Sequence, residues 1–301
     1  MTFPNAAIII VNYNQINHTL ECIKSLLRAN ADLSQMIIVD NNSSDNSVEI
    51  LRETFGDTLT LCNLPENKGY PYALNQGIPV GLEKGFDWLL LMNNDVTVDK
   101  EFLNELRSAT EENPTARLFA PAILYYDNPE LIWNIGYINI PGTLIGVRSY
   151  RGHKYSESLP KYLNIDVLHG CTMMVHKSVI EKIGLFDDSN LIYGDDADFS
   201  IRAYRAGFEM IAATRAKMWH KISLTMGREK PFTRFLRTRN TIAFYNKYTK
   251  GFQKLVMFLF TLAKAVVTIT KDIFRGHAYL IKPYLYGIYD GWTNNKKERT
   301  F

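Results

Sequence analysis

The chain has 301 residues, of which 46% are hydrophobic and 22% are charged. This composition is typical of a folded protein with a hydrophobic core and excludes disordered and collagen-like chains, and the length allows about two domains. The three cysteines include no C-x-x-C pair, which excludes a disulfide framework and a zinc knuckle and predicts a reducing, cytoplasmic setting. We expect no signal peptide, because the first residues lack a basic region followed by a long apolar run.

The formal net charge of +3 is unevenly distributed along the chain. Residues 228–301 contain 15 Lys and Arg against 4 Asp and Glu, a net charge of +11, which leaves the rest of the chain at −8. Such a basic segment is either the solvated face of a group of helices or a surface attracted to anionic lipid headgroups. We expect no nucleic-acid partner.

The first third of the chain alternates two kinds of apolar pattern. Short continuous apolar runs predict buried strands at 6–11, 35–39, 58–63 and 87–92. Helical spacing between them predicts helices at 19–28, 47–55 and 74–84, the last weakened by two glycines and a proline. Because the connections are too long for hairpins, the order predicts right-handed βαβ crossovers and an open, mostly parallel sheet.

The rest of the chain is mixed and then helical. The patterns predict strands at 118–124 and 170–176, helices at 178–183 and 197–206, and a binding loop or lid in the Gly-, Pro-, Tyr- and Trp-rich stretch 125–162. From residue 232 onward they predict three helices, at 232–248, 252–274 and 278–289. The fold class is therefore α/β, with an α/β domain over 1–230 and a basic, amphipathic helical region over 231–301.

Polar segments follow three of the predicted parallel strands, namely Asn12-Tyr-Asn14, Asp40 to Asp45, and Asn93-Asn-Asp95. Ligands of open parallel sheets bind beyond the carboxyl ends of the strands, where these segments would converge. The alternative for each is an ordinary turn or helix cap. No Gly-rich phosphate loop occurs, so a bound diphosphate would need another counter-charge, such as a divalent metal.

Asp95 is a candidate ligand for that metal, since a strand end positions its carboxylate rigidly. Mg²⁺ and Mn²⁺ take few protein ligands and complete their shell with water and phosphate oxygens. His220 is a candidate second ligand, although a histidine beside a tryptophan is also common in structural roles.

The densest acidic cluster is Gly194-Asp-Asp-Ala-Asp198, which opens a predicted helix. Acidic residues in a first helical turn complement the helix dipole, and this accounts for one or two of the three carboxylates. Adjacent like charges raise at least one pKa, which suits a general base in this cluster. We expect Asp198 to cap the helix or to pair with Arg202.

As an ordered set, these motifs resemble glycosyltransferase family 2, the inverting GT-A fold, and most closely its bacterial rhamnosyltransferase-type and galactofuranosyltransferase-type members. The resemblance covers roughly residues 5–245. It rests on five segments: Ile10-Val-Asn-Tyr-Asn14, Val39-Asp-Asn-Asn-Ser-Ser-Asp45, Glu66-Asn-Lys-Gly-Tyr-Pro-Tyr-Ala-Leu-Asn-Gln-Gly77, Asn93-Asn-Asp95, and Gly184 to Gly207.

The resemblance implies a role for each matching residue. It implies Asp196, with its neighbour Asp195, on the catalytic side, and Asp95 and His220 as metal ligands. It implies contacts to the donor nucleotide and sugar from a larger set: Asn12, Asn14, Asp40, Asn42, Asp45, Asn67, Lys68, Gly69, Asn75, Asn93 and Asn94. Two departures from the family pattern are Asn93, where many members have Asp, and the Asp195-Asp196 pair in place of Glu-Asp.

The resemblance also implies the reaction. The expected cofactors are Mg²⁺ or Mn²⁺ with a dTDP- or UDP-sugar as donor, bound by residues 1–105. The expected acceptor is a hydroxyl of a glycan or lipid-linked glycan, bound by residues 106–230, in the synthesis of a surface polysaccharide such as O-antigen or capsule. The transferred sugar would be rhamnose, galactofuranose or another hexose. The alternative is a catalytically inactive carbohydrate-binding or scaffold protein on the same fold.

The C-terminal region raises the question of a membrane. Its apolar stretch 255–269 is shorter than the roughly 20 residues that span a bilayer, and it contains Lys264. With the surrounding basic and aromatic residues, it predicts helices that lie at the inner face of the cell membrane. The alternative is packing on the α/β domain or on a second copy of the chain in a homo-oligomer.

Overall fold

The computed structural model describes residues 5–189, 191–221, 230–295 and 299. The chain forms two compact units. The sheet unit comprises residues 1–138, 147–191 and 195–222, and the helical unit comprises 139–146, 192–194 and 223–301.

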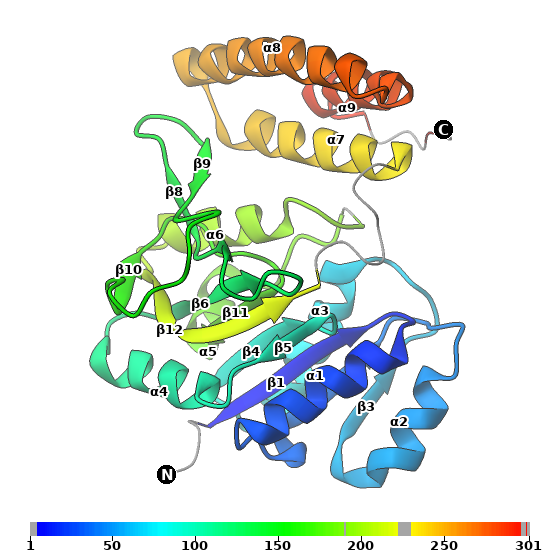
Figure 1. Ribbon diagram of the computed structural model, residues 1–301, viewed down its shortest axis with the longest axis vertical. Coiled ribbons are helices and arrows are strands. Elements are labelled where there is room, and N and C mark those ends of the chain that lie inside the picture. Colours follow the sequence, from blue (N-terminus) through cyan, green and yellow to red (C-terminus); the bar gives the residue numbers. More distant parts are fainter. Residues whose placement is uncertain (1–4, 190, 222–229, 296–298, 300–301) are drawn as a thin grey trace. The chain divides into compact units, whose positions relative to one another are not determined.

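A mixed sheet forms the centre of the sheet unit, in the order β10-β12-β6-β11-β4-β1-β2-β3 (Figure 1). One half of the sheet is parallel, as the sequence predicts. In this half, β1 (Ala6–Asn12) lies between β2 (Met36–Asp40) and β4 (Trp88–Asn93). β3 (Thr60–Asn63) lies beyond β2. β11 (Thr172–His176) lies antiparallel between β4 and β6 (Leu118–Tyr125). The start of β11 therefore lies at the same edge as the end of β4.

Shorter strands complete the sheet around β12 (Met210–His220). β10 (Tyr162–Asn164) and β5 (Val96–Val98) pair with it antiparallel, and β6 pairs with it in parallel. β7 (Ile132–Asn134) extends β6, while β8 (Tyr137–Asn139) and β9 (Gly146–Arg148) form a separate two-stranded sheet. The α/β fold class expected from the sequence is confirmed.

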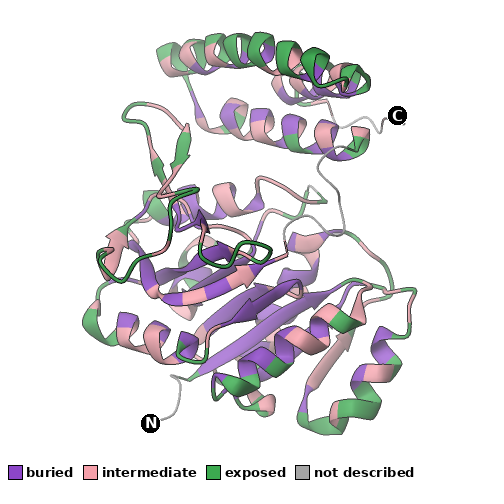
Figure 2. Cartoon of the chain, viewed as in Figure 1, coloured by how far each residue is buried: buried purple, intermediate pink, exposed green. Residues whose placement is uncertain are grey.

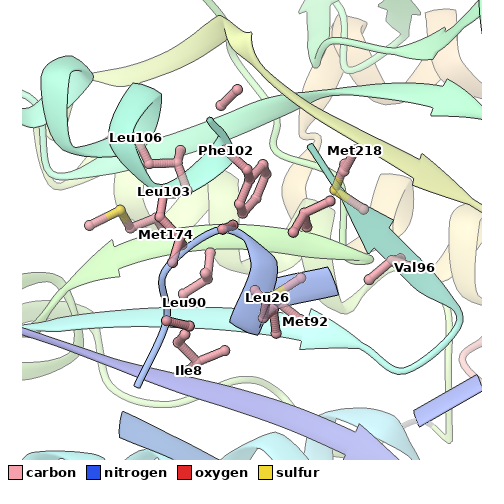
Figure 3. Close-up of a cluster of buried hydrophobic side chains, with 14 of the residues drawn as sticks. Ile8, Leu26, Leu90, Met92, Val96, Phe102, Leu103, Leu106, Met174 and Met218 are labelled. Atoms are coloured by element: carbon pink, nitrogen blue, oxygen red, sulfur yellow. The ribbon is translucent and has the colours of Figure 1, made fainter. Parts of the chain in front are cut away.

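Helices cover both faces of the sheet and enclose two cores. One face is covered by α1 (Ile16–Arg28), α2 (Ser47–Phe55) and α4 (Phe102–Glu112). The other face is covered by α3 (Tyr70–Glu83), α5 (Lys177–Ile183) and α6 (Asp195–Arg205). In the first core, Phe102 and Leu106 of α4 and Leu26 of α1 pack with Ile8 and Met92 of the sheet (Figure 3). The central strands of the sheet, β1, β2, β4, β6 and β11, are buried along most of their length (Figure 2).

The structure differs from the predicted elements in a few places. It adds α4, β5 and the short helices η1 (Leu33–Gln35) and η2 (Gly56–Thr58), and it breaks the predicted loop 125–162 with β7, β8 and β9. A strand of three residues is too short to show a period, which explains why β5 is not visible in the sequence. α3 begins at Tyr70, four residues before the predicted start, because Pro71 fits the first turn of a helix.

Glycines let α3 approach the sheet closely. A Cβ at Gly77 would lie 2.7 Å from the Cγ2 atoms of both Ile9 and Val39, and one at Gly81 would lie 3.0 Å from Leu89. The glycines that weaken the helical pattern of α3 in the sequence are thus the positions where strand side chains need room.

We expect Gly77→Ala to destabilise the protein by about 1–3 kcal/mol, because the β-branched side chains of Ile9 and Val39 have little freedom to move away. Urea denaturation followed by circular dichroism measures the free energy of unfolding. Glu83→Ala, at the exposed end of α3, is the matched control and should change it by less than about 0.5 kcal/mol. Equal stability of the two variants would contradict the close packing.

The helical unit contains α7 (Pro231–Tyr248), α8 (Gly251–Phe274), η3 (Ala278–Leu280) and α9 (Ile281–Thr293). α7 and α9 pack closely, since a Cβ at Gly287 or Gly291 would lie 2.7 Å from atoms of α7. Among the described residues, α8 is the one helix that is long and apolar enough to cross a membrane. It is longer than the apolar stretch 255–269 counted in the sequence, so its length alone does not exclude a span.

Candidate active site

The ends of β1 and β2 carry a network of polar side chains. Asn12 is buried and donates hydrogen bonds to Asp40 Oδ2 at 3.2 Å and Ser43 Oγ at 3.0 Å. Asp40 Oδ1 accepts the main-chain N–H of Ser43 at 2.9 Å, and Asn94 Nδ2 donates to Asn12 Oδ1 at 3.3 Å. The structure therefore brings Asn12, Asp40 and Asn94 together at one edge of the sheet.

The turn after β2 is held by a side chain of the turn after β1 and by one of its own. Asn14 Oδ1 accepts the N–H of Ser44 at 2.8 Å, and Asp45 Oδ1 accepts the N–H of Ser47 at 3.1 Å at the start of α2. Asn14 and Asn42 both have a left-handed backbone, with φ of 56° and 61°. Asn42 is exposed, so its side chain is accessible to a ligand.

The segment before α3 lies next to this turn. Asn67 Oδ1 accepts bonds from Asn41 Nδ2 at 3.0 Å and from the N–H of Gly69 at 2.9 Å. Gly69 has a φ of 105°, and a Cβ there would overlap the main chain of Leu191, so the position requires glycine. Lys68 is exposed and forms an ion pair with Glu66.

Asn75 lies in a different environment from the other expected donor contacts. It is buried, and both ends of its amide bond the main chain of Phe186: Nδ2 donates to the carbonyl at 2.9 Å, and Oδ1 accepts the N–H at 3.0 Å. The structure thus uses these bonds of Asn75 to join α3 to the segment that precedes α6.

Asp95 and His220 form a pair because β5 lies antiparallel to the end of β12. His220 Nε2 lies 3.2 Å from Asp95 Oδ1, and both residues are buried. Asp95 Oδ1 and His220 Nδ1 are buried atoms without a hydrogen-bond partner. Octahedral coordination with bonds of about 2.1 Å places neighbouring ligand atoms about 3 Å apart, so the spacing and the unsatisfied carboxylate oxygen fit a Mg²⁺ or Mn²⁺ ion. Within the described residues, no group of three or more His, Cys, Asp or Glu is placed to hold an ion.

Asp196 lies in the first turn of α6 and contacts the loop before β11. Its Oδ2 accepts the N–H of Gly170 at 3.1 Å, and its Oδ1 accepts the N–H of Ala197 at 2.8 Å. Burial raises the pKa of the Asp196 carboxyl, and these N–H groups and Arg148 oppose the shift. A carboxyl that keeps some contact with solvent and has a raised pKa is suited to accept a proton.

The other two acidic residues of α6 are arranged differently. Asp195 is buried at the start of the helix. Asp198 accepts a hydrogen bond from Arg202 Nε at 2.8 Å, which confirms the pairing expected from the sequence. Arg202 also donates to the carbonyls of Ile183 and Leu185, so this pair anchors α6 to the end of α5.

The loop His169-Gly170-Cys171 connects the Asp95–His220 pair to Asp196. Gly170 bonds Asp196 and accepts a hydrogen bond from the Tyr70 hydroxyl at 3.0 Å, while the carbonyl of Cys171 accepts the N–H of Asn93 at 2.9 Å. The carboxylates of Asp95 and Asp196 both raise the pKa of the Cys171 thiol, after burial as the main cause. Asp95 and Asp196 therefore lie around one loop, at the same edge of the sheet.

A group of aromatic side chains lies beside this loop and could not be predicted from the sequence. The Trp133 ring lies 4.4 Å from the His169 ring and 4.9 Å from the His220 ring, and Tyr137 stacks on His169 at 6.2 Å. The Arg148 guanidinium lies 5.1 Å from the centre of Trp133. Three of these five residues, Trp133, Tyr137 and Arg148, come from the predicted loop 125–162, where composition alone points to binding but to no particular residue.

Comparison with known sequences decides the family. The sequence model described as "Glycosyl transferase family 2" matches residues 7–184, more than half of the chain. The chain belongs to this family. Family 2 membership makes it a glycosyltransferase enzyme, as the resemblance implies.

Two curated relatives align with most of this glycosyltransferase. "Low-salt glycan biosynthesis hexosyltransferase Agl10" of Haloferax volcanii is 26% identical over 97% of this chain and 93% of its own length. "dTDP-rhamnosyl transferase RfbF" of Shigella flexneri is 24% identical over 81% of this chain and 80% of its own.

Solved structures show the same GT-A fold. A mannosyltransferase from Pyrobaculum calidifontis, in complex with GDP-Man and Mn²⁺, matches with a TM-score of 0.60 over 98% of this chain and 89% of its own, at 13% identity. At that identity the likeness concerns the fold.

Proposed function

We propose that this family 2 enzyme transfers a sugar, with inversion, from a nucleoside diphosphate donor to a hydroxyl of a glycan or lipid-linked glycan. The observation that carries the proposal is the loop 169–171, which joins the Asp196 carboxyl to the neighbourhood of the Asp95–His220 pair. An inverting transfer needs a base and a group that stabilises the leaving phosphate on either side of one anomeric carbon.

In this mechanism, Asp196 accepts the proton of the acceptor hydroxyl as its oxygen attacks the anomeric carbon. The bond from that carbon to the donor phosphate breaks, and the leaving nucleoside diphosphate takes the electron pair. The N–H groups of Gly170 and Ala197 orient the Asp196 carboxylate. Asp195 shapes the same helix start, where its negative charge is favoured by the helix dipole.

Asp95 and His220 would hold a divalent metal, for which the unsatisfied Asp95 oxygen and the 3.2 Å spacing are the supporting observations. Such an ion supplies positive charge to a leaving diphosphate. Asn93 and Asn94 flank Asp95, and the Asn12 bond to Asn94 joins this turn to the end of β1.

The polar turns after β1 and β2 would bind the nucleoside. Asp40 is held by Asn12 and Ser43, Asn42 and Asn14 present polar side chains in tight turns, and Asp45 fixes the start of α2. Asn67, Lys68 and Gly69 would line the next part of the donor site, where Gly69 lets the main chain of Leu191 approach closely. Asn75 would support the donor site by holding the segment at Phe186, without contacting the donor directly.

The names of two relatives support a proposal for the donor class. A dTDP- or UDP-linked rhamnose, galactofuranose or other hexose is proposed, since one relative is named a dTDP-rhamnosyl transferase and another a hexosyltransferase of glycan biosynthesis. The pathway proposed is assembly of a surface polysaccharide such as O-antigen or capsule.

Release of nucleoside diphosphate from a panel of nucleotide sugars, with and without Mn²⁺ or Mg²⁺, tests the function. We expect metal-dependent release with one donor, increased by a lipid-linked glycan acceptor. Tight donor binding without any turnover would instead support the inactive carbohydrate-binding alternative.

Arg148 provides a test of the base. Its positive charge lowers the pKa of Asp196, so Arg148→Gln should raise that pKa and move the acid limb of the kcat/KM profile to higher pH. Arg151→Gln, in an exposed loop three residues away, is the control and should leave the limb in place. An unchanged acid limb in Arg148→Gln would contradict the role of Asp196.

The outer face of α8 supports attachment to the inner face of the cell membrane. Helical spacing places Leu255, Leu259, Leu262, Val266 and Ile273 along one face, and all of them are exposed. The opposite face is buried in the helical unit and includes Thr261 and Asp272 (Figure 2). A helix that exposes its apolar face and carries lysines beside it fits the surface of an anionic membrane.

We expect the pair Leu259→Glu and Val266→Glu to weaken flotation with vesicles containing phosphatidylglycerol by roughly tenfold or more, because both side chains are more than half exposed on α8. The melting temperature should not fall, since neither side chain is buried. The control pair Lys24→Glu and Glu53→Gln changes exposed residues of the sheet unit. If the α8 pair floated normally but lost a dimer in analytical ultracentrifugation, the face would be an interface between two copies.

A further inference from the structure

Arg148, the last residue of β9, carries a positive charge with no carboxylate partner among the residues that the structure describes. The residue is partly buried, and its Nε donates a hydrogen bond to the Tyr137 hydroxyl at 3.2 Å. Its two terminal nitrogens form no hydrogen bond with any other described residue. The N–H groups of both terminal nitrogens are therefore available to a hydrogen-bond acceptor.

Two aromatic rings hold the guanidinium in place. Its carbon lies 5.1 Å from the centre of the Trp133 ring and 5.6 Å from the centre of the Tyr137 ring. Trp133 is buried in the first core, and Tyr137 lies in β8, which pairs with β9. Contacts with aromatic rings position a cation but leave its charge in place. A guanidinium fixed in this way presents a fork of N–H groups that matches two oxygens of a phosphate or a carboxylate.

The charge of Arg148 lies near the proposed base. It lowers the pKa of the Asp196 carboxyl, and it also lowers the pKa of His169 and of the Cys171 thiol. Arg148 therefore lies close to the loop 169–171 and to the start of α6. A positive charge that lowers the pKa of a base makes it a weaker proton acceptor, so this cation does not assist the proposed proton transfer. An oxyanion bound to Arg148 would offset that effect.

The proposed mechanism assigns the surroundings of Asp196 to the glycosyl acceptor. The donor diphosphate has its own counter-charge in the metal proposed at Asp95 and His220. Asp196 receives the hydroxyl that attacks, so a group bound to Arg148 belongs to the molecule that carries that hydroxyl. A partly buried cation is most stable when an anion pairs with it, and the acceptor is the molecule that can supply this anion.

We propose that Arg148 selects acceptors that carry an oxyanion, a phosphate or a carboxylate, close to the accepting hydroxyl. The terminal nitrogens of Arg148 would donate two parallel hydrogen bonds to this group. The inference rests on the proposed role of Asp196 and adds to it a residue that determines acceptor specificity. An uncharged acceptor would leave the guanidinium unpaired and would bind more weakly.

Isothermal titration calorimetry with the full chain tests the charge preference. The protein is saturated with Mn²⁺ and UDP or dTDP, so that a phosphate probe cannot occupy the metal site. The probes are hexose 1-phosphates and methyl glycosides of hexuronic acids, each compared with the methyl glycoside of the corresponding hexose. We expect at least one charged probe to bind at least about tenfold more tightly than its uncharged match, because hydrogen bonds to charged groups are stronger. The class of that probe identifies the oxyanion as phosphate or carboxylate. Absence of a charge preference in every pair would overturn the proposal.

Arg148→Gln should remove this preference. Arg148→Lys, which keeps the charge but not the fork of N–H groups, should retain part of it. Arg151→Gln, at an exposed position three residues away, is the matched control and should retain all of it. A preference that survives in Arg148→Gln would overturn the proposal. An equal loss of affinity for charged and uncharged probes in that variant would mean a structural role, and an equal loss of preference in Arg151→Gln would mean general attraction; either would overturn it too.

Nucleotide binding and donor hydrolysis separate this inference from the proposed function. The dissociation constant of the nucleoside diphosphate, measured with Mn²⁺, should change little in Arg148→Gln. A loss of nucleotide affinity as large as the loss for the charged probe would place Arg148 at the donor and overturn the inference. Metal-dependent donor hydrolysis by the wild type without a charge preference among the probes would overturn the inference alone. Absence of hydrolysis with every donor would overturn the proposed function.

Discussion

Asp196→Asn is expected to lower kcat/KM for sugar transfer by roughly a hundred- to ten-thousand-fold, because an amide cannot accept the acceptor proton. The donor dissociation constant should change little, since Asp196 is proposed to face the acceptor. In the wild type, burial raises the pKa of this carboxyl above its ordinary 3.8, so kcat/KM should fall on acidification at a pH above that value. Steady-state kinetics across pH and donor titration of the variant measure both effects.

Asp198→Asn is the matched control, two residues away on the same helix. It breaks the bond to Arg202 that anchors α6, so it should lower the melting temperature while a substantial part of kcat remains. If Asp196→Asn retained normal turnover, or if both variants lost kcat equally at a temperature where both are folded, Asp196 would not be the base.

Asp95→Asn and His220→Gln form the second large prediction. Each removes one of the two side chains proposed to hold the metal, so Mn²⁺ affinity in the presence of donor should fall by more than the roughly 10–100-fold that loss of an outer-shell partner causes. In the wild type, Mn²⁺ and donor together at a hundred times the dissociation constant should stabilise the fold by about 2.7 kcal/mol. Thermal unfolding with and without both ligands measures this.

The control for the metal prediction is Asp99→Asn, which changes a carboxylate at the other end of β5 that faces Lys217. The melting temperature of Asp99→Asn should rise on addition of Mn²⁺ and donor as it does in the wild type. A full ligand-induced shift in Asp95→Asn would contradict the assignment of the metal site.

Most of the parallel half of the fold could be predicted from the sequence because β1, β2 and β4 are buried on both faces. The runs at 6–11 and 87–92 are continuous in hydrophobicity, and each ends in a polar residue that marks the edge of the sheet. The polar ends of β1, β2 and β4 then converge as the rule for parallel sheets requires. Asn12 and Asp40 are in contact for that reason.

The antiparallel half could not be predicted in this way. β5, β7, β8 and β9 have three residues each, too few for a period, and their pairing depends on contacts distant in sequence. The proximity of Asp95 and His220 follows from the register of β5 on β12, where His220 pairs with Val96. The ligand preferences of a divalent metal suggested both residues from the sequence. Their spacing of 3.2 Å could be known only from the structure.

The loop 169–171 shows a second limit of prediction from the sequence. The sequence predicts that Gly170 and Cys171 begin the strand 170–176, whereas β11 begins at Thr172. Only the reversed direction of β11 places His169-Gly170-Cys171 at the edge where β4 ends. A polar residue at the start of an antiparallel strand is the signal that would have found it. Trp133, Tyr137 and Arg148 carried no such signal, because the elements that hold them are short.

Pulsed electron paramagnetic resonance of Mn²⁺ bound together with the nucleotide-sugar donor tests the central claim most directly. The account predicts a phosphorus coupling from the donor diphosphate and a histidine nitrogen coupling, with the nitrogen coupling lost in His220→Gln. A phosphorus coupling with no nitrogen coupling in the wild type, or a nitrogen coupling that survives in His220→Gln, would contradict it.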